Sequence, residues 1–142
     1  MLKMLIAVDG STHSQRAIEA AIRLQAQTKG LEALLLNVRE WPLLQGDLPP
    51  VRYEEIERDQ IRHQSELLES TLAAARRGGL ELVSTLAEVG EPATEIARVA
   101  QEKGVDQIVM GTHGRGAVGS LLMGSVAQRV VHLAKVPVVL VK

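Results

Sequence analysis

Hydrophobic residues along the chain alternate between short apolar runs and longer amphipathic segments. The runs predict five β-strands, at Leu2–Val8, Glu32–Val38, Leu80–Ala87, Gln107–Met110 and Val136–Val141. The first, fourth and fifth runs are almost wholly apolar, which is typical of strands covered by helices on both faces. Each gap between runs exceeds the dozen or so residues that a parallel crossover needs, so the pattern favours parallel strands over hairpins.

The gaps between the runs carry helical periodicity. In the first gap, Ala17, Ile18, Ala21 and Ile22 form one apolar stripe. Similar stripes occupy the three later gaps. The first of these ends before Gly78-Gly79, the second begins at Pro92 and ends at Gly104, and the third spans Val126–Ala134. The element order therefore predicts an α/β fold, an open five-stranded parallel sheet of order 3-2-1-4-5 with helices on both faces, in one Rossmann-like domain over residues 1–142. Other doubly wound strand orders stay open. The proline-containing segment Arg39–Arg52 is expected to be a surface connection, with a lid as the alternative.

Composition narrows the function classes. The 142 residues include no cysteine, which excludes thiolate metal sites and thiol nucleophiles. The net charge of −1 offers no field to attract nucleic acid or an anionic membrane, and Trp41 and Tyr53 are too few aromatic residues for base stacking along a single strand. The first apolar run stops at Asp9, too early for a secretion signal or a membrane span. We expect a soluble cytoplasmic protein that binds neither nucleic acid nor membranes.

The densest chemical signal is the segment Met110–Ser125, which joins the fourth strand to the last helix. Five glycines between Gly111 and Gly124 let backbone amides approach a ligand and adopt positive φ. The amides at the start of the following helix favour an anion, and Ser125 could cap that helix or donate to a phosphate. Residues 107–142 hold four basic residues and no acidic one, whereas residues 1–106 carry a charge of −5. This pattern predicts phosphate binding, with a flexible loop and a chance clustering of surface charges as the alternatives.

Several familiar site types are not supported. The chain has no Gly-Lys-Ser/Thr, so it lacks the lysine of a P-loop. Gly114-x-Gly116-x-x-Gly119 follows the fourth strand rather than the first, and no acid lies downstream of it to hold a ribose. The four histidines show no metal-ligand spacing, and His113 is interpreted as an exposed or phosphate-adjacent donor rather than a base. Arg115 could neutralise a phosphate or simply be exposed. We therefore predict no catalytic residue and no metal site.

Four segments, taken in their order along the chain, resemble the ATP-binding members of the universal stress protein family. The signature is Gly111-x2-Gly114-x9-Gly124-Ser125, and Leu5–Ser11, Gly90-Glu91-Pro92 and Val136–Val141 accompany it. The resemblance implies the adenine nucleotide alpha hydrolase-like form of the fold and ATP as ligand, with magnesium carried on its phosphates. The nucleotide contacts that it implies are Asp9, Val38, Met110, Gly111, Gly114, Gly124, Ser125 and Val126. In the predicted strand order Asp9 and Gly111 flank the switch point of the sheet, where ligands of such folds bind. Asp9-Gly10 could instead be only a turn before a helix capped by Ser11 or Thr12.

Three functions follow for comparison. The resemblance favours an ATP-binding signalling or stress-response module with at most slow hydrolysis, and it implies a homodimer through Val136–Val141. The alternative is a dimeric interaction module that works without a nucleotide, since an apolar edge strand invites pairing. A flavin or dinucleotide enzyme is the third, supported by the hydroxyl-rich Ser11-Thr12-His13-Ser14 but opposed by the scarcity of aromatic residues.

Overall fold

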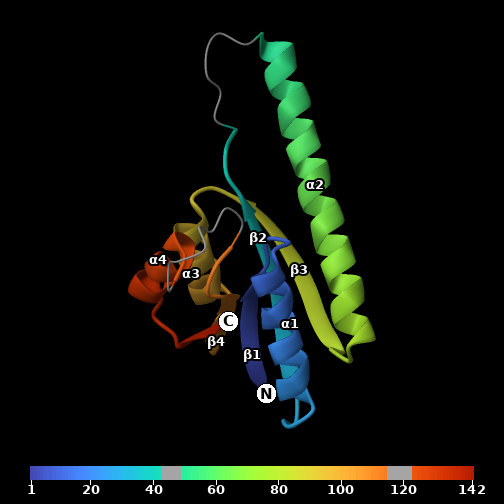
Figure 1. The fold of residues 1–142 in the computed structure, drawn as a ribbon, viewed down its shortest axis with the longest axis vertical. Helices are drawn as coiled ribbons and strands as arrows, with labels where there is room; N and C mark the ends of the chain where they lie inside the picture. The colour runs from blue at the N-terminus through green and yellow to red at the C-terminus, as the bar shows by residue number, and fades with distance from the viewer. Residues whose placement is uncertain (43–48, 115–122) are drawn as a thin grey trace.

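The computed structural model describes residues 1–42, 49–114 and 123–142 (Figure 1). Strands and helices alternate along the described chain, in the order β1 (Leu2–Ala7), α1 (Thr12–Gln25), β2 (Leu31–Arg39), α2 (Pro50–Arg77), β3 (Leu82–Val89), α3 (Pro92–Glu102), β4 (Gln107–Gly111), α4 (Ser125–Leu133) and β5 (Val138–Val141).

The sheet has the predicted architecture. Its strand order is β3-β2-β1-β4-β5, and all four strand pairs are parallel. Leu2 of β1 lies opposite Leu31 of β2, while Met4 lies opposite Gln107 of β4. β1 is therefore central, and the chain reverses its direction of travel across the sheet between β3 and β4. The predicted α/β fold with strand order 3-2-1-4-5 is confirmed.

Two hydrophobic cores lie on opposite faces of the sheet, because successive strand side chains point to opposite sides. Along β1, Met4 and Ile6 pack with residues of α1 and α2, whereas Leu5 packs with residues of α3 and α4. Figure 1 shows the same division, with α1 and α2 on one side of the sheet and α3 and α4 on the other. Each face is thus covered by one helix pair, as the almost wholly apolar first and fourth runs predict. The same expectation is wrong for the fifth run, since β5 is an edge strand and Val139 on it is 40% exposed.

Two strands begin later than the sequence predicts. The third was expected at Leu80, but the Leu80 N–H donates to the Ala75 carbonyl at 3.0 Å, so this residue still belongs to the closing turn of α2. The fifth was expected at Val136, but the regular pairing starts at Val138, opposite Ile108. Pro137 has no N–H to give to the ladder and contributes only its carbonyl, which accepts from the Ile108 N–H.

The helix ends follow local chemistry. The Ser11 hydroxyl accepts from the Ser14 N–H and caps α1. Pro92 is the first residue of α3, as predicted, and the Glu91 carboxylate caps that helix. Of the helices in the described ranges, none is long and apolar enough to cross a membrane.

Candidate functional site

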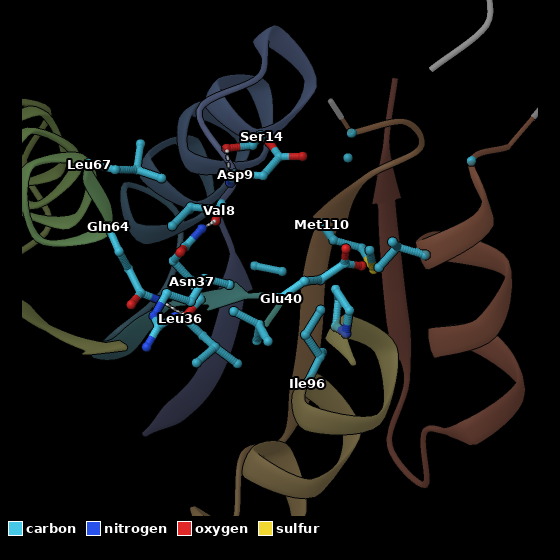
Figure 2. A pocket seen from close by; sticks show the side chains of 18 of the residues that line it. Val8, Asp9, Ser14, Leu36, Asn37, Glu40, Gln64, Leu67, Ile96 and Met110 are labelled. Carbon is cyan, nitrogen blue, oxygen red and sulfur yellow. Dashed lines mark hydrogen bonds between the residues drawn. The ribbon is translucent and has the colours of Figure 1, made fainter. Parts of the chain in front are cut away.

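A cleft of about 1020 Å³ opens at the carboxyl ends of β1, β2 and β4. The amino-terminal ends of α3 and α4 form one side of it, and the middle of α2 forms the other. Figure 2 shows the side chains that line it, with Asp9 and Ser14 beside α1 and Met110 on the far side. This is the position where the reversal of strand order leaves room for a ligand in an open parallel sheet.

Asp9 lies at the end of β1 and serves the turn into α1. Its Oδ1 accepts from the Ser11 N–H at 2.9 Å, and its own N–H donates to the Ser14 hydroxyl at 3.2 Å. Gly10 completes the turn with φ of +82°, a conformation that favours glycine. The predicted turn is therefore present, and the Asp9 side chain also lines the cleft. Both interpretations of Asp9-Gly10 are compatible with this geometry.

The glycines after β4 are explained by close contacts. A Cβ atom on Gly111 would lie 2.5 Å from the His13 Cβ and 2.8 Å from the His13 carbonyl carbon. A Cβ atom on Gly114 would lie 2.4 Å from the Asp9 Oδ2. The expectation of positive φ in this segment is wrong for its described glycines, since Gly111, Gly114 and Gly124 are not among those with positive φ. Glycine is needed here because the end of β4 passes against the first turn of α1.

The amino-terminal end of α4 faces the cleft through Gly124, Ser125 and Val126. Gly124 is the N-cap residue, and no side chain caps the helix. Of the two roles considered for Ser125, capping of α4 is therefore excluded, because the helix begins at Ser125 itself. The Gly124 N–H donates to the Thr112 carbonyl at 2.6 Å, which brings the start of α4 against the end of β4. The next amides of the helix have no intrahelical acceptor and point toward its amino-terminal end.

Val38 and Met110 complete the set of predicted contact residues. Each is the next-to-last residue of its strand, β2 or β4, and contributes an apolar side chain to the cleft. All eight residues that the resemblance implies line this one cleft, although they come from four separate parts of the chain. Gly116, Gly119 and Arg115, which the sequence analysis also considered, lie outside the described residues.

A buried polar network in the cleft wall was not predicted. The Gln64 amide nitrogen donates to the Asn37 carbonyl at 3.0 Å and to the Glu88 carbonyl at 2.9 Å. The Asn37 side chain in turn donates to the Val8 carbonyl at 2.7 Å. These bonds tie α2 to the ends of three neighbouring strands. The signal for Asn37 was its polarity inside an apolar run, whereas nothing in the sequence marked Gln64.

A second group that the sequence analysis missed lies where β2 ends. Glu40 and Trp41 both line the cleft, and the Trp41 side chain is 56% exposed. The Arg39 guanidinium lies 5.8 Å from the Trp41 ring centroid, within the range of a cation–π contact, and donates to Gln60 on α2 at 3.4 Å. Figure 2 shows Glu40 reaching from β2 in the direction of Met110.

Charge in the cleft is mixed. Asp9, Glu40, Glu66, Arg39, His63 and His113 line it. The His113 Nδ1 lies 3.0 Å from the Thr112 hydroxyl, and its ring centroid lies 5.1 Å from that of His13. Within residues 1–42, 49–114 and 123–142, no three His, Asp or Glu side chains are grouped so that they could hold a metal ion.

Among the described residues, the basic side chains near the carboxyl terminus do not gather at the cleft, contrary to the phosphate-binding interpretation of their charge. Arg129, Lys135 and Lys142 are absent from its lining. Arg129 instead donates to the Glu91 carboxylate at 2.9 Å and joins α4 to the cap of α3. Desolvation raises the pKa of Glu91, but hydrogen bonds from Thr94 and Ala93 and the charge of Arg129 outweigh it, so the pKa is lowered. Because Arg129, Lys135 and Lys142 lie elsewhere, backbone amides are the main donors that the described residues offer at this end of the cleft.

Comparison with known proteins gives a consistent result. The model of the universal stress protein family matches residues 1–142. The universal stress protein YxiE of Bacillus subtilis is 32% identical, over 99% of this chain and 98% of its own. A universal stress protein of Thermus aquaticus is 36% identical, over 98% of this chain and 97% of its own. The solved structure of MJ0577 superposes with a TM-score of 0.83 at 26% identity, covering 99% of this chain and 94% of that one.

Two similar structures were solved with nucleotides. A universal stress protein from Archaeoglobus fulgidus in complex with dAMP has a TM-score of 0.72 at 23% identity and covers 100% of this chain and 98% of its own. An Arabidopsis thaliana family member with AMP bound has a TM-score of 0.71 at 21% identity and covers 100% of this chain and 92% of its own. At these identities the likeness establishes the shared fold.

Proposed function

We propose that this chain, which belongs to the universal stress protein family, binds ATP in the cleft at the carboxyl ends of β1, β2 and β4. The bound nucleotide would alter the assembly or partner binding of a cytoplasmic stress-response module. The observation that supports this most is that the eight residues implied by the family signature all line one cleft. The AMP and dAMP bound to relatives of the same fold support an adenine nucleotide in particular.

The two ends of the cleft suit the two ends of a nucleotide. At α4, uncapped amides and the positive end of the helix dipole favour phosphates. Gly114 lets the backbone pass close beside Asp9, which can accept from a ribose hydroxyl. Val38 on β2 and Met110 on β4 offer apolar surface to a base. Because the described residues form no metal cluster of their own, magnesium would arrive bound to the triphosphate.

Retention of ATP fits this cleft better than rapid turnover. The chain has no P-loop lysine, and we assign no nucleophile and base pair among the described lining residues. Slow hydrolysis by a water molecule held near the bound triphosphate is compatible with the site, and no residue is proposed as catalytic.

Two measurements test ATP binding. The first is to denature freshly purified protein and identify any released small molecule by mass and ultraviolet absorbance. Adenine nucleotide supports the proposal, and a coloured cofactor would point to the flavin alternative instead. The second is equilibrium dialysis of ATP against wild type and the Gly114→Val/Gly124→Val variant. The new side chains would meet Asp9 and the backbone of Thr112 and His113, so binding should be lost.

A matched control separates loss of the site from loss of the fold. Ala74→Val adds side-chain volume to an exposed position of α2, away from the cleft lining, and should bind ATP like the wild type. Unchanged ATP binding in the double glycine variant, with circular dichroism like that of the wild type, would rule out this site.

A second candidate function is a homodimeric interaction module that needs no nucleotide. β5 is the last strand of the sheet, and Val139 on it is 40% exposed. The Pro137 and Val141 carbonyls accept from β4, so by strand alternation the backbone groups of Val138 and Leu140 point outward. An outward edge of this kind can pair with a second copy about a twofold axis.

The dimer is tested by sedimentation velocity at micromolar concentration. Wild type should sediment at twice the chain mass of 15.4 kDa, through the predicted strand Val136–Val141. Val138→Pro removes one outward N–H at an edge, where the sheet itself tolerates proline, and should shift the population toward monomer. A monomeric wild type would exclude the dimer. A dimer that releases no nucleotide on denaturation would favour the interaction module over the ATP-binding module.

A further inference from the structure

We propose that Glu40 and Trp41, at the end of β2, form the base-recognition element of the cleft and select a purine that carries an amino group at position 6. The proposal rests on nucleotide binding in this cleft and adds which residues distinguish one base from another. Both residues line the cleft, and they follow Val38, the last apolar residue of the strand.

The strand order determines which end of the cleft receives the base. Phosphates are favoured at α4, which begins beside the end of β4. β2 is separated from β4 by β1, so its end lies two strand spacings away, about 10 Å. This separation is of the order of one nucleoside. A nucleotide whose phosphates lie at α4 therefore places its base near the end of β2.

Trp41 offers the stacking surface. Its side chain is 56% exposed although it lines the cleft, and the Arg39 guanidinium lies 5.8 Å from its ring centroid. Gln60 on α2 accepts from Arg39 and helps to hold that guanidinium in place. An indole supported on one side by a cation, with over half of its surface accessible, can stack against a purine with its open side.

Glu40 supplies the discrimination. A carboxylate only accepts hydrogen bonds, so at purine position 6 it favours the amino group of adenine over a hydrogen atom, which offers no such bond, and over a carbonyl, which it would repel. In Figure 2 the Glu40 side chain extends toward Met110, across the region between the ends of β2 and β4. Asp9 is at the end of β1 beside Gly114, between the ends of β2 and β4, where a ribose would lie. The two carboxylates would therefore contact different parts of one nucleotide.

The test compares ATP with purine riboside triphosphate, which lacks the 6-amino group but keeps N1 as an acceptor, by equilibrium dialysis with magnesium. Wild type is expected to prefer ATP by about tenfold or more, the effect of a hydrogen bond to a charged group. Glu40→Gln should lower this ratio, because a neutral amide oxygen accepts a weaker hydrogen bond than a carboxylate. Trp41→Leu should weaken both nucleotides by about 5- to 30-fold and leave their ratio unchanged. Trp41 is the sole tryptophan, so its emission should change saturably with ATP.

Glu81→Gln is the matched control, since it removes the same charge from an exposed position just before the amino end of β3, whereas the cleft lies at the carboxyl ends of the parallel strands. It should bind both nucleotides like the wild type. If wild type binds ATP but Glu40→Gln keeps the ratio and Trp41→Leu keeps both affinities, the base-recognition proposal is wrong while ATP binding stands. If wild type binds neither nucleotide, both proposals fail.

Discussion

Replacing Gln64 with glutamate exchanges an amide for a carboxylate of the same shape inside the cleft wall. The Gln64 side chain is 8% exposed, and its nitrogen donates to the Asn37 and Glu88 carbonyls. An ionised carboxylate has no proton to donate and would face two carbonyl oxygens. The variant therefore removes two buried hydrogen bonds and adds repulsion, without changing side-chain volume.

The expected loss at pH 7 is about 2–4 kcal/mol of unfolding free energy, because each buried hydrogen bond contributes about 0.5–1.5 kcal/mol and an unpaired buried group costs more. For a chain of this size that corresponds to a fall in Tm of about 5–15 °C. Burial and the facing carbonyls raise the pKa of the introduced carboxyl in the folded state. The penalty therefore grows as pH rises through that raised pKa, and it shrinks at lower pH, where the protonated acid can donate again.

Urea unfolding followed by far-ultraviolet circular dichroism, at pH 7 and at pH 5, measures both effects. Gln60→Glu is the control, one helical turn earlier on α2. Gln60 accepts from Arg39, and a carboxylate can do the same, so stability should change by less than about 0.5 kcal/mol. A Gln64→Glu variant that is no less stable than Gln60→Glu, or equally destabilised at both pH values, would refute the role assigned to the Gln64 network.

Two further predictions concern the contacts around the cleft. Gly111→Ala should lower the free energy of unfolding by about 1–3 kcal/mol, measured by thermal or urea unfolding, because the new Cβ would meet the Cβ and backbone of His13. Unchanged stability would argue against this contact between β4 and α1. Glu91→Gln should lower stability by less than about 1 kcal/mol at neutral pH, since this partly exposed carboxylate caps α3 and pairs with Arg129. The pKa of Glu91 is lowered on folding, so its stabilising contribution is present above the ordinary carboxyl pKa and disappears as pH falls through the lowered value. Urea titrations of wild type and Glu91→Gln should therefore converge in acid, and a difference that persists there would contradict the assignment.

The parallel sheet could be predicted because the lengths of the gaps between apolar runs disfavour hairpins, whereas the order 3-2-1-4-5 was one of several doubly wound orders that the sequence left open. The boundaries that differed depend on single hydrogen bonds. Leu80 still bonds to the last turn of α2, and Pro137 has no N–H for the ladder, so each strand begins two residues late. A hydrophobic pattern predicts which residues are buried, but it does not predict which carbonyl each N–H donates to, so it cannot place the first residue of a strand.

Residues of the cleft were predictable where glycine spacing and short motifs marked them, as at Gly111 and Gly124. Gln64 was not, because its role depends on the rotation of α2 against the sheet, and many rotations satisfy the same amphipathic pattern. The pairing of Arg129 with Glu91, 38 positions away in the chain, could not be predicted either, because it depends on how α4 packs beside the amino end of α3. Charge composition indicated a basic carboxyl-terminal third but could not say which acid each base would meet.

The length of α2 has a consequence for motion. Its 28 residues span about 42 Å, whereas the eight residues of β3 span about 26 Å, and Figure 1 shows the helix continuing well past the sheet. Gln64 anchors the helix near its midpoint, and Leu68 and Ala75 bury its second half. Amide protons in that second half should exchange with solvent only when the domain opens as a whole, while those near Tyr53 should exchange through local fraying. The two halves of α2 are therefore expected to differ in local stability, with the amino-terminal half opening more easily than the carboxyl-terminal half.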